Sequence, residues 1–435
     1  MSALERLGGF VAQTAPPAGA MRELTELHLI DSIGACIAGS HTAEGSALHR
    51  FHDSMPDGPA SPGLDLGTLC AQARLSEIDD IHLASMTTPG GIVIPAALSI
   101  AAGPFAADDV FAAILAGYEV MTRLGRAIDG PAVLYRGIWP TYFATPAAVA
   151  AVTARLLRLD ARAAVNALAL ALTFAAPGVG HHNAATSARW LAVGNAARNG
   201  RTAALAAQRG LTGDLKLLDG NFLPDIYGIT PDLAVLADGL GEGSVLPDVS
   251  FKPWCAARQT MAATQALREI IAGGVAPASV TEVSAFMLPP HRRMIDHGVV
   301  TGDRASHLTS LPYCMALAAV EPEQAFEVQQ SPSQLPEAVR AFMTKIKVEA
   351  DEGLLADYPQ RWRARVRVVA DGRTHELAVT DVPGDPARTF DRALVRTKFL
   401  RFVTPALGPK HAELMLARCE DACANGRLED LAAFI

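Results

Sequence analysis

Two features are scarce in this 435-residue chain: long uninterrupted apolar runs and clusters of basic residues. Its longest apolar stretches are amphipathic or are interrupted by glycine, proline or a charge, so we expect no membrane span. The formal net charge is −8 and no basic run offsets it, so non-specific binding to nucleic acid is not expected. Residues 1–14 lack the basic region and apolar core of a signal peptide, which predicts a cytoplasmic protein.

Cysteine is also sparse, with six residues and no regular spacing. We therefore expect buried thiols in a reducing compartment rather than a disulfide framework. His49 and His52 have the spacing of ligands on one helix face, but no third metal ligand accompanies them. The glycines near residues 90 and 178–180 do not follow the strand, Gly-x-Gly, helix order of a nucleotide-binding loop. The sequence thus predicts neither a metal site nor a nucleotide site.

The chain is instead rich in apolar, alanine-containing sequence, with half of its residues hydrophobic and only 19% charged. A chain of this length and composition predicts two domains with extensive buried surface. The segment 43–72 is richer in glycine, proline, serine and aspartate and is predicted as loop with a short helix. Apolar residues at helical spacing predict helices after Pro95 and over 20–39, 108–128, 143–158, 160–175 and 187–209.

Strand patterns begin only beyond about Pro247. Alternating residues predict strands over 280–288 and 345–351, and 364–379 is predicted as a hairpin with Asp371-Gly372 at its turn. Helices are predicted over 256–272 and after Phe390. The fold class is therefore mainly α. We expect a large all-helical domain over 1–250, completed by 400–435, and a smaller α+β lid domain over 251–399, with the active cleft between them.

Seven segments, in order, resemble the MmgE/PrpD family. They are DSIGACIAG (31–39), EIDDIH with TTPGGIVIPAAL (77–98), AGYEVMTRLGRAI (116–128), RGIWPTYFATPAAVAAVTARLLRLD (136–160), VGNAARNGRTAALAAQRGLTG (193–213), FKPWCAAR (251–258) and SLPYCMALA (310–318). The resemblance implies a helical domain carrying most of the active site, an α+β lid, a homodimer, and no metal or organic cofactor. The family includes 2-methylcitrate dehydratases, cis-aconitate decarboxylases and iminodisuccinate epimerases, which all make or break a bond next to a carboxylate.

Within these motifs Asp79, Asp80, Lys252 and Tyr313 match the family, whereas most of the family's histidines are replaced. The histidine before the acidic motif, the histidine of the H-P-S segment and the histidine of the H-P-T segment fall at Arg74, Thr88 and Trp139. A family lysine and the histidine after it fall at Arg189 and Ala192, and the histidine after the Lys-Pro motif falls at or near Ala257. The sequence is therefore equipped to bind an anion and has fewer groups to move protons.

Removing a proton next to a carboxylate requires a base, with cations or donors nearby. Asp79 or Asp80 is the candidate base or positions His82, and His82 is itself a candidate acid or base. The adjacent carboxylates also suit a helix cap or a solvated acidic turn, and His82 also suits a packed loop position.

The candidate ligands for the substrate's carboxylates are cationic. They are Lys252, Arg189, Arg258 and Arg74. Tyr313 is the candidate donor to a developing oxyanion, although a tyrosine in so apolar a helix also suits the core. Thr88, Trp139 and His181 complete the candidate substrate-binding residues, and the loop around His181 equally suits an exposed surface.

These residues predict a cofactor-independent lyase or hydratase that acts on a small polycarboxylate resembling 2-methylcitrate or aconitate. An epimerase, isomerase or decarboxylase on the same scaffold is an alternative. So is a non-catalytic member that binds a carboxylate, which the missing histidines favour. The expected partners are this small substrate and a second copy of the chain.

Overall fold

The structure is a computed structural model of the whole chain, and it describes every residue except 56–64, 102, 104, 179–185 and 433–435. The chain is mainly helical with a small sheet in its C-terminal half, which confirms the predicted fold class. It divides into two compact units. Unit 1 comprises Met1–Gly180, Ser187–Val249 and Asp391–Ile435, and unit 2 contains Ser250–Phe390.

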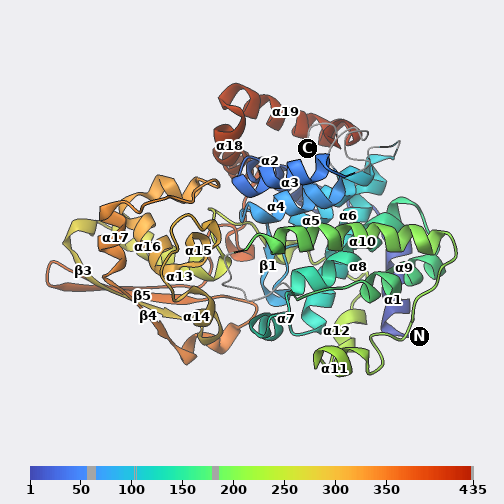
Figure 1. Cartoon of the computed structure of the whole chain (residues 1–435), viewed down its shortest axis with the longest axis horizontal. Coiled ribbons are helices and arrows are strands. Elements are labelled where there is room, and N and C mark those ends of the chain that lie inside the picture. Colours follow the sequence, from blue (N-terminus) through green and yellow to red (C-terminus); the bar gives the residue numbers. More distant parts are fainter. Residues whose placement is uncertain (56–64, 102, 104, 179–185, 433–435) are drawn as a thin grey trace. The chain divides into compact units, whose positions relative to one another are not determined.

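Unit 1 is built from helices, drawn in Figure 1. They are α1 (Ala3–Gln13), α2 (Gly19–Ser40), α3 (Ala43–Asp53), α4 (Leu66–Leu75), α5 (Gly90–Ile100), α6 (Ala107–Ala127), α7 (Gly130–Val133), α8 (Pro140–Leu156), α9 (Ala161–Thr173), α10 (Ala188–Gln208), α11 (Phe222–Tyr227), α12 (Leu233–Ala237), α18 (Arg392–Leu407), α19 (Pro409–Asn425) and α20 (Glu429–Ala432). Short elements join them: β1 (Ile81–His82) and the 3-10 turns η1 (Leu83–Ser85), η2 (Leu134–Arg136) and η3 (Leu246–Asp248). β2 (Val249–Ser250) runs from unit 1 into unit 2.

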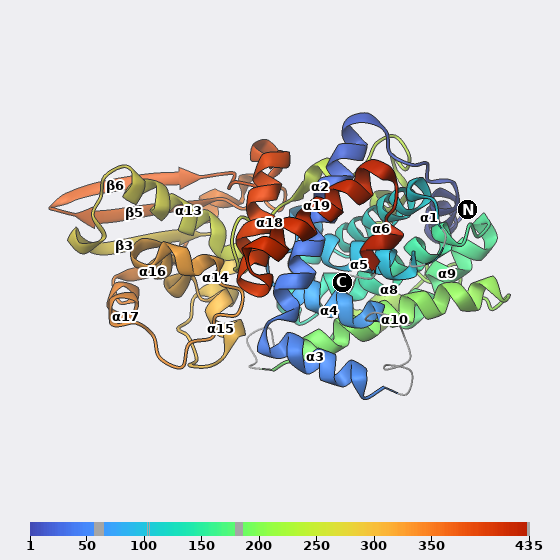
Figure 2. The same cartoon turned by 90° about the horizontal axis from the view of Figure 1, so that it is seen from above.

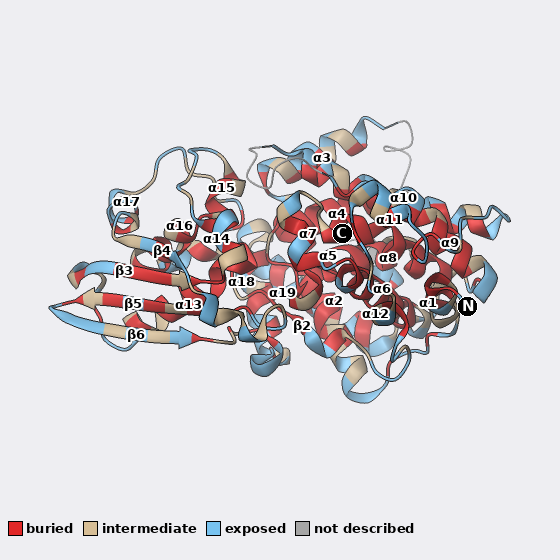
Figure 3. Cartoon of the chain, turned by 90° about the horizontal axis from the view of Figure 1, so that it is seen from below, coloured by how far each residue is buried: buried red, intermediate tan, exposed pale blue. Residues whose placement is uncertain are grey.

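Helix α8 forms the centre of the unit 1 core. It packs against α5, α6, α9 and α10, and its residues up to Ala154 are all buried, as the red ribbon of Figure 3 shows. Its sequence carries no charge before Arg155, so the helix has no polar face to turn toward water. Because α8 is enclosed by these helices, the side chains of its first turn face other parts of the protein and not water.

The C-terminal helices return to the N-terminal part of the same unit. Helix α18 packs against α2 and α19, and Figure 2 shows these three helices side by side. None of the helices in the described ranges is long and apolar enough to cross a membrane.

The prediction of a loop with one short helix over 43–72 is wrong, because two helices, α3 and α4, form there. Thr42 and Asp65 cap these helices, because their side chains accept hydrogen bonds from the backbone N–H groups of Gly45 and Gly67. Asp65, one of the polar residues that suggested a loop, is therefore a helix start signal, and Thr42 acts in the same way just before the segment. The other helices predicted in unit 1 agree with α2, α5, α6, α8, α9 and α10, and α5 continues through Pro95.

Unit 2 combines a four-stranded sheet with helices. The strands, in sheet order, are β4 (Ile346–Ala350), β3 (Val280–Met287), β5 (Ala364–Ala370) and β6 (Arg373–Val379). β3 pairs in parallel with β4, and the other neighbours pair antiparallel. The helices are α13 (Arg258–Ala272), which packs on β5 and β6, and α14 (Pro289–Ile295), α15 (Arg304–Thr309), α16 (Leu311–Val320) and α17 (Glu337–Met343). The 3-10 turns are η4 (Pro277–Ser279), η5 (Pro322–Phe326), η6 (Glu352–Asp357) and η7 (Pro386–Arg388).

The predicted hairpin is confirmed in β5 and β6. Asp371 and Gly372 both have positive φ, 49° and 70°, as a primed two-residue turn requires. Along β5 the alternating residues Ala364, Val366 and Val368 are buried, so one face of the strand joins the core of unit 2.

Candidate active site

Asp79, the first carboxylate of the acidic motif, is paired with Arg74 from the end of α4. Nη1 of Arg74 lies 2.6 Å from each Asp79 oxygen, and Nη2 lies 3.3 Å from a Glu77 oxygen. Asp79 is fully buried and Arg74 nearly so. Burial alone would lower the pKa of Arg74, but Asp79 and Glu77 outweigh it and raise that pKa. The structure thus places the cation predicted at position 74 directly against a predicted base.

Asp80 is held by donors from three helices. One of its oxygens accepts the backbone N–H of Gly90 at 2.6 Å, at the start of α5. The other accepts the Tyr118 hydroxyl at 2.6 Å and lies 2.8 Å from Nδ1 of His28. Burial and the Asp80 charge raise the pKa of Tyr118, which keeps it a neutral donor. Asp80 is therefore an anchor that joins α2, α5 and α6.

Gly90 and Gly91 let these carboxylates approach the start of α5. A Cβ on Gly90 would lie 2.4 Å from an Asp80 oxygen, and one on Gly91 would lie 2.6 Å from an Asp79 oxygen. Neither position has room for a methyl group unless the carboxylate moves.

We predict that Gly90→Ala destabilises unit 1 by about 1–3 kcal/mol, the usual cost of overpacking a tight core. The added methyl group would push the Asp80 carboxylate away from its three donors. Thermal unfolding measures the effect. Gly9→Ala in α1 is the matched control, because a Cβ there meets no atom within 4 Å and alanine favours a helix. A Gly90→Ala variant as stable as the parent would contradict the packing described here.

His82 lies beside the acidic pair in sequence but is held in a tight local turn. Its Nδ1 shares a 2.8 Å hydrogen bond with the Ser85 hydroxyl, and its backbone N–H donates to the Thr87 carbonyl at 2.8 Å. Burial, assisted by the charge of Arg126, lowers the pKa of His82 to about 3. The imidazole is therefore neutral at ordinary pH.

The start of α8 carries two aromatic residues beside the start of α5. The Thr141 hydroxyl lies 3.2 Å from the backbone nitrogen of Thr88 and 3.3 Å from its hydroxyl. Trp139, which precedes the first turn, stacks on Tyr142 with ring centroids 5.5 Å apart and an angle of 17°. Thr88 and Trp139, two of the predicted substrate-binding residues, are thus connected through Thr141 and the first turn of α8.

Arg189 in the first turn of α10 extends this stack. Its guanidinium carbon lies 5.4 Å from the Trp139 ring and 5.7 Å from the Trp190 ring, a cation–π arrangement. Burial raises the pKa of Tyr142 to about 12, although Arg74 and Arg189 act in the opposite direction. The Tyr142 hydroxyl and Trp139 Nε1 have no hydrogen-bond partner among the described residues. Two buried donors therefore remain available beside two cations.

In unit 2, Lys252 and Arg258 are both buried, at 1% and 2% exposed. Nη2 of Arg258 donates to both Asp385 oxygens, at 2.6 and 2.9 Å, and the guanidinium carbon lies 5.7 Å from the Trp362 ring. Its Nε and Nη1 have no hydrogen-bond partner within the described residues. Arg258 therefore has donors left for an anion.

Tyr313, the third site residue predicted in unit 2, lies in α16. It is 3% exposed, and burial raises its pKa. It lines a cavity of about 20 Å³ together with His307, whose ring meets the Tyr313 ring edge to face at 4.9 Å. His181, the remaining predicted residue, lies outside the described residues.

The sequence did not single out His28, Tyr118, Tyr142 or His307. Tyr118 and Tyr142 lie inside segments that resemble family motifs, so their position was the available signal. His28 and His307 lie outside every such segment, and only the packing of α2 and α15 reveals their contacts.

The six cysteines are all buried and none forms a disulfide. Burial raises the pKa of five of them, Cys36, Cys70, Cys314, Cys419 and Cys423, which opposes thiolate chemistry. Among the described residues no group of three His, Cys, Asp or Glu side chains is arranged to hold a metal ion.

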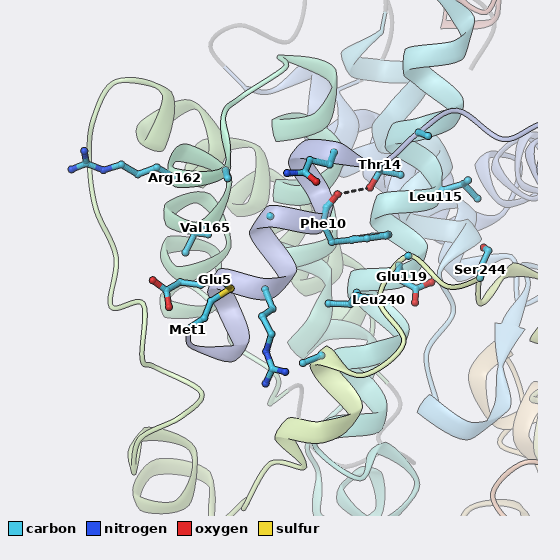
Figure 4. A pocket seen from close by; sticks show the side chains of 18 of the residues that line it. Met1, Glu5, Phe10, Thr14, Leu115, Glu119, Arg162, Val165, Leu240 and Ser244 are labelled. Carbon is cyan, nitrogen blue, oxygen red and sulfur yellow. Dashed lines mark hydrogen bonds between the residues drawn. The ribbon is translucent and has the colours of Figure 1, made fainter.

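Unit 1 also contains a pocket of about 930 Å³ that none of the predicted site residues lines. It lies along α1, where Phe10 extends toward Leu115 and Glu119 of α6 (Figure 4). Glu119 is already paired with Arg123 at 2.6 Å, and Arg162 is exposed and points away from Phe10 (Figure 4). The charged side chains Glu119 and Arg162 therefore do not converge in this pocket.

Family models match both parts of the chain. The MmgE/PrpD N-terminal domain matches residues 5–223, and the MmgE/PrpD C-terminal domain matches residues 254–422. Among curated proteins, none matches the chain.

Proposed function

The chain belongs to the MmgE/PrpD family, a generally enzymatic family of dehydratase and lyase type, and from this premise we propose that it dehydrates, or hydrates, a small polycarboxylate. The bond to be broken is the C–H bond next to a carboxylate, and the protein's own side chains supply the acid and the base. No metal or organic cofactor takes part in the proposed reaction.

The observation that carries the proposal is the group of buried side chains around Tyr142. Arg189, Trp139 and Tyr142 form a stack, and Arg74 and Asp79 lie close enough to affect the pKa of Tyr142. An anionic substrate would receive hydrogen bonds from Arg189, Trp139 Nε1 and the Tyr142 hydroxyl. Of these donors, Trp139 Nε1 and the Tyr142 hydroxyl have no hydrogen-bond partner among the described residues. Such buried donors are costly, and they suit a site that awaits an acceptor.

Asp79 is the proposed base. Its carboxylate is paired with Arg74 and lies in the group around Tyr142, whereas the Asp80 carboxylate accepts hydrogen bonds from Gly90, Tyr118 and His28. Asp79 would take the proton from carbon, and the departing hydroxide would take the Tyr142 phenol proton and leave as water. The raised pKa of Tyr142, about 12, keeps that proton available. Asp80 and His82 would then position Asp79 rather than carry protons, and Thr88 would help fix the start of α8.

For unit 2 we propose that Lys252 and Arg258 bind substrate carboxylates and that Tyr313 donates to the developing oxyanion. Their burial and, for Arg258, its unused donors support these roles. His181 is proposed as a further substrate ligand on sequence grounds alone. A homodimer in the cytoplasm is proposed on the same grounds, and sedimentation at micromolar concentration tests the dimer.

The reaction is tested by incubating the purified protein with a panel of hydroxylated and unsaturated di- and tricarboxylates, including 2-methylcitrate and cis-aconitate. We expect alkene absorbance to rise with a hydroxy acid or to fall with its alkene. Tyr142→Phe should lower kcat by about 10²–10⁴-fold, because it removes the general acid. Arg189→Met should raise KM by about 10- to 100-fold, the loss of one charged hydrogen bond.

Arg201→Met, an exposed change on the same helix as Arg189, is the matched control and should leave both constants unchanged. Deuterium uptake from solvent without elimination would replace the proposal by an epimerase or isomerase, and release of CO₂ would replace it by a decarboxylase. Thermal stabilisation by these acids without turnover or exchange would indicate a carboxylate-binding protein that is not an enzyme. The replacement of imidazoles by Trp139 and Thr88 is the observation that keeps that outcome open.

A further inference from the structure

His307 is a buried imidazole whose tautomer the structure defines. It lies in α15, is 2% exposed, and its Nδ1 is 2.7 Å from the Asp303 backbone carbonyl. A carbonyl oxygen only accepts hydrogen bonds, so Nδ1 carries the proton of the neutral ring and Nε2 carries a lone pair. Nε2 is buried and has no hydrogen-bond partner among the described residues. Nε2 of His307 is therefore a buried hydrogen-bond acceptor with a fixed orientation inside unit 2.

The acceptor belongs to a cavity that Tyr313 also lines. The cavity measures about 20 Å³, room for a single water molecule. Its other polar walls come from Trp254, whose Nε1 has no hydrogen-bond partner among the described residues, and from Cys255, Cys314, Glu327 and Gln330. The Tyr313 ring lies edge to face against His307, 4.9 Å between centroids at 88°. Buried polar groups of native proteins are rarely left without a partner, so this lone pair requires an explanation.

We infer that His307 is a positioning residue for Tyr313. One water in the cavity donates one hydrogen to Nε2 of His307 and the other to the Tyr313 hydroxyl oxygen, so the phenolic O–H is directed away from the water and toward the substrate. The inference rests on the proposed function, in which Tyr313 donates to the substrate. It places one histidine in a site whose family motifs have lost theirs, at a position outside those motifs.

Other charged groups near His307 do not replace this role. Within its own segment, the Arg304 guanidinium donates to the Val328 carbonyl and to Cys255 Sγ, and the Asp303 side chain caps α15. Facing it are Tyr313 and Cys314 of α16, Cys255 of the segment before α13, and Glu327 after η5.

The test compares His307→Phe with His307→Gln in the full chain. Phenylalanine keeps a ring against Tyr313 but offers no acceptor, whereas glutamine places an amide oxygen near the Nε2 position. With the most active acid of the panel, we expect His307→Phe to lower kcat by about 10- to 100-fold with KM within about twofold, the loss of one hydrogen bond to a reacting group. His307→Gln should recover most of kcat, because its amide oxygen supplies the lost acceptor. His297→Gln, a partly exposed histidine before α15, should change neither kcat nor KM.

A second measurement needs no substrate and no stable variant at position 307. In ¹⁵N-histidine spectra of the wild-type chain, the His307 ring should show the Nδ1–H tautomer, and Tyr313→Phe should shift its Nε2 resonance. An Nε2–H tautomer, an Nε2 resonance indifferent to Tyr313→Phe, or a His307→Phe enzyme with unchanged kcat would each overturn the inference. If the spectra agree but no acid is turned over, the proposed function fails while the His307–Tyr313 coupling stands.

Discussion

Lys398→Met should destabilise unit 1 by about 3–5 kcal/mol, the cost of leaving one buried charge without its partner. Lys398 on α18 places its Nζ 2.6 Å from an Asp31 oxygen and 2.7 Å from the Ile78 carbonyl. The side chains of Lys398 and Asp31 are only 4% and 2% exposed. Burial raises the pKa of Asp31 even beside the lysine, so the carboxylate depends on that cation to remain charged. Ile78 directly precedes Asp79, so the loss should also loosen the acidic motif.

Hydrogen exchange of the α2 amides is the suitable measurement, because a chain of two units does not unfold in one two-state step. Lys410→Met, an exposed change on α19, should have no effect. The double variant Lys398→Met with Asp31→Leu should regain most of the lost stability, since an apolar pair replaces a buried ion pair at little cost. A single variant with unchanged protection of α2 would show that the ion pair contributes nothing.

Acid should destabilise both units, because each of them buries a neutral histidine. Burial lowers the pKa of His82 to about 3, and it does the same for His291, which packs its ring against Trp362 at 4.6 Å. In the unfolded chain these rings titrate near the ordinary value of 6.5. Their depressed folded pKa means that the stabilisation is complete above pH 6.5 and falls as the pH drops toward 3. Each histidine should lower the free energy of unfolding by about 1.4 kcal/mol per pH unit in that window. The loss should reach about 2 kcal/mol at pH 5.

Denaturation midpoints at pH 7 and pH 5, read by exchange in each unit, measure this loss. His82→Gln should flatten the dependence in unit 1 alone, and His291→Gln should flatten it in unit 2 alone. Burial also raises the pKa of the Asp31 carboxyl, so the comparison of each variant with the parent, and not the pH difference alone, isolates its imidazole. Equal slopes in the parent and both variants would mean that neither ring is buried as a neutral group.

Periodicity and turn chemistry in the sequence determined most of the elements. The helical spacing over 108–128 and the alternation around Asp371-Gly372 became α6 and the β5–β6 hairpin, because hydrophobic period and positive-φ residues act through local backbone geometry. The same local reasoning failed for α3 and α4, since Thr42 and Asp65 serve equally well in loops and as helix caps. Only the contacts of the folded chain distinguish the two uses.

The sequence also predicted the positions of the site motifs, but it did not predict the contacts of each side chain. Arg74 lies five residues from Asp79 in the chain, so their pairing was within reach of local reasoning. Asp80 meets Tyr118 and His28 across 38 and 52 residues, and Lys398 meets the Ile78 carbonyl across 320 residues. Such long-range contacts decide which side chains surround each carboxylate. The sequence alone therefore determined the family, the helices and the charged residues on offer, while tertiary packing decided which charges are satisfied, because desolvation and pairing exist only once distant segments enclose them.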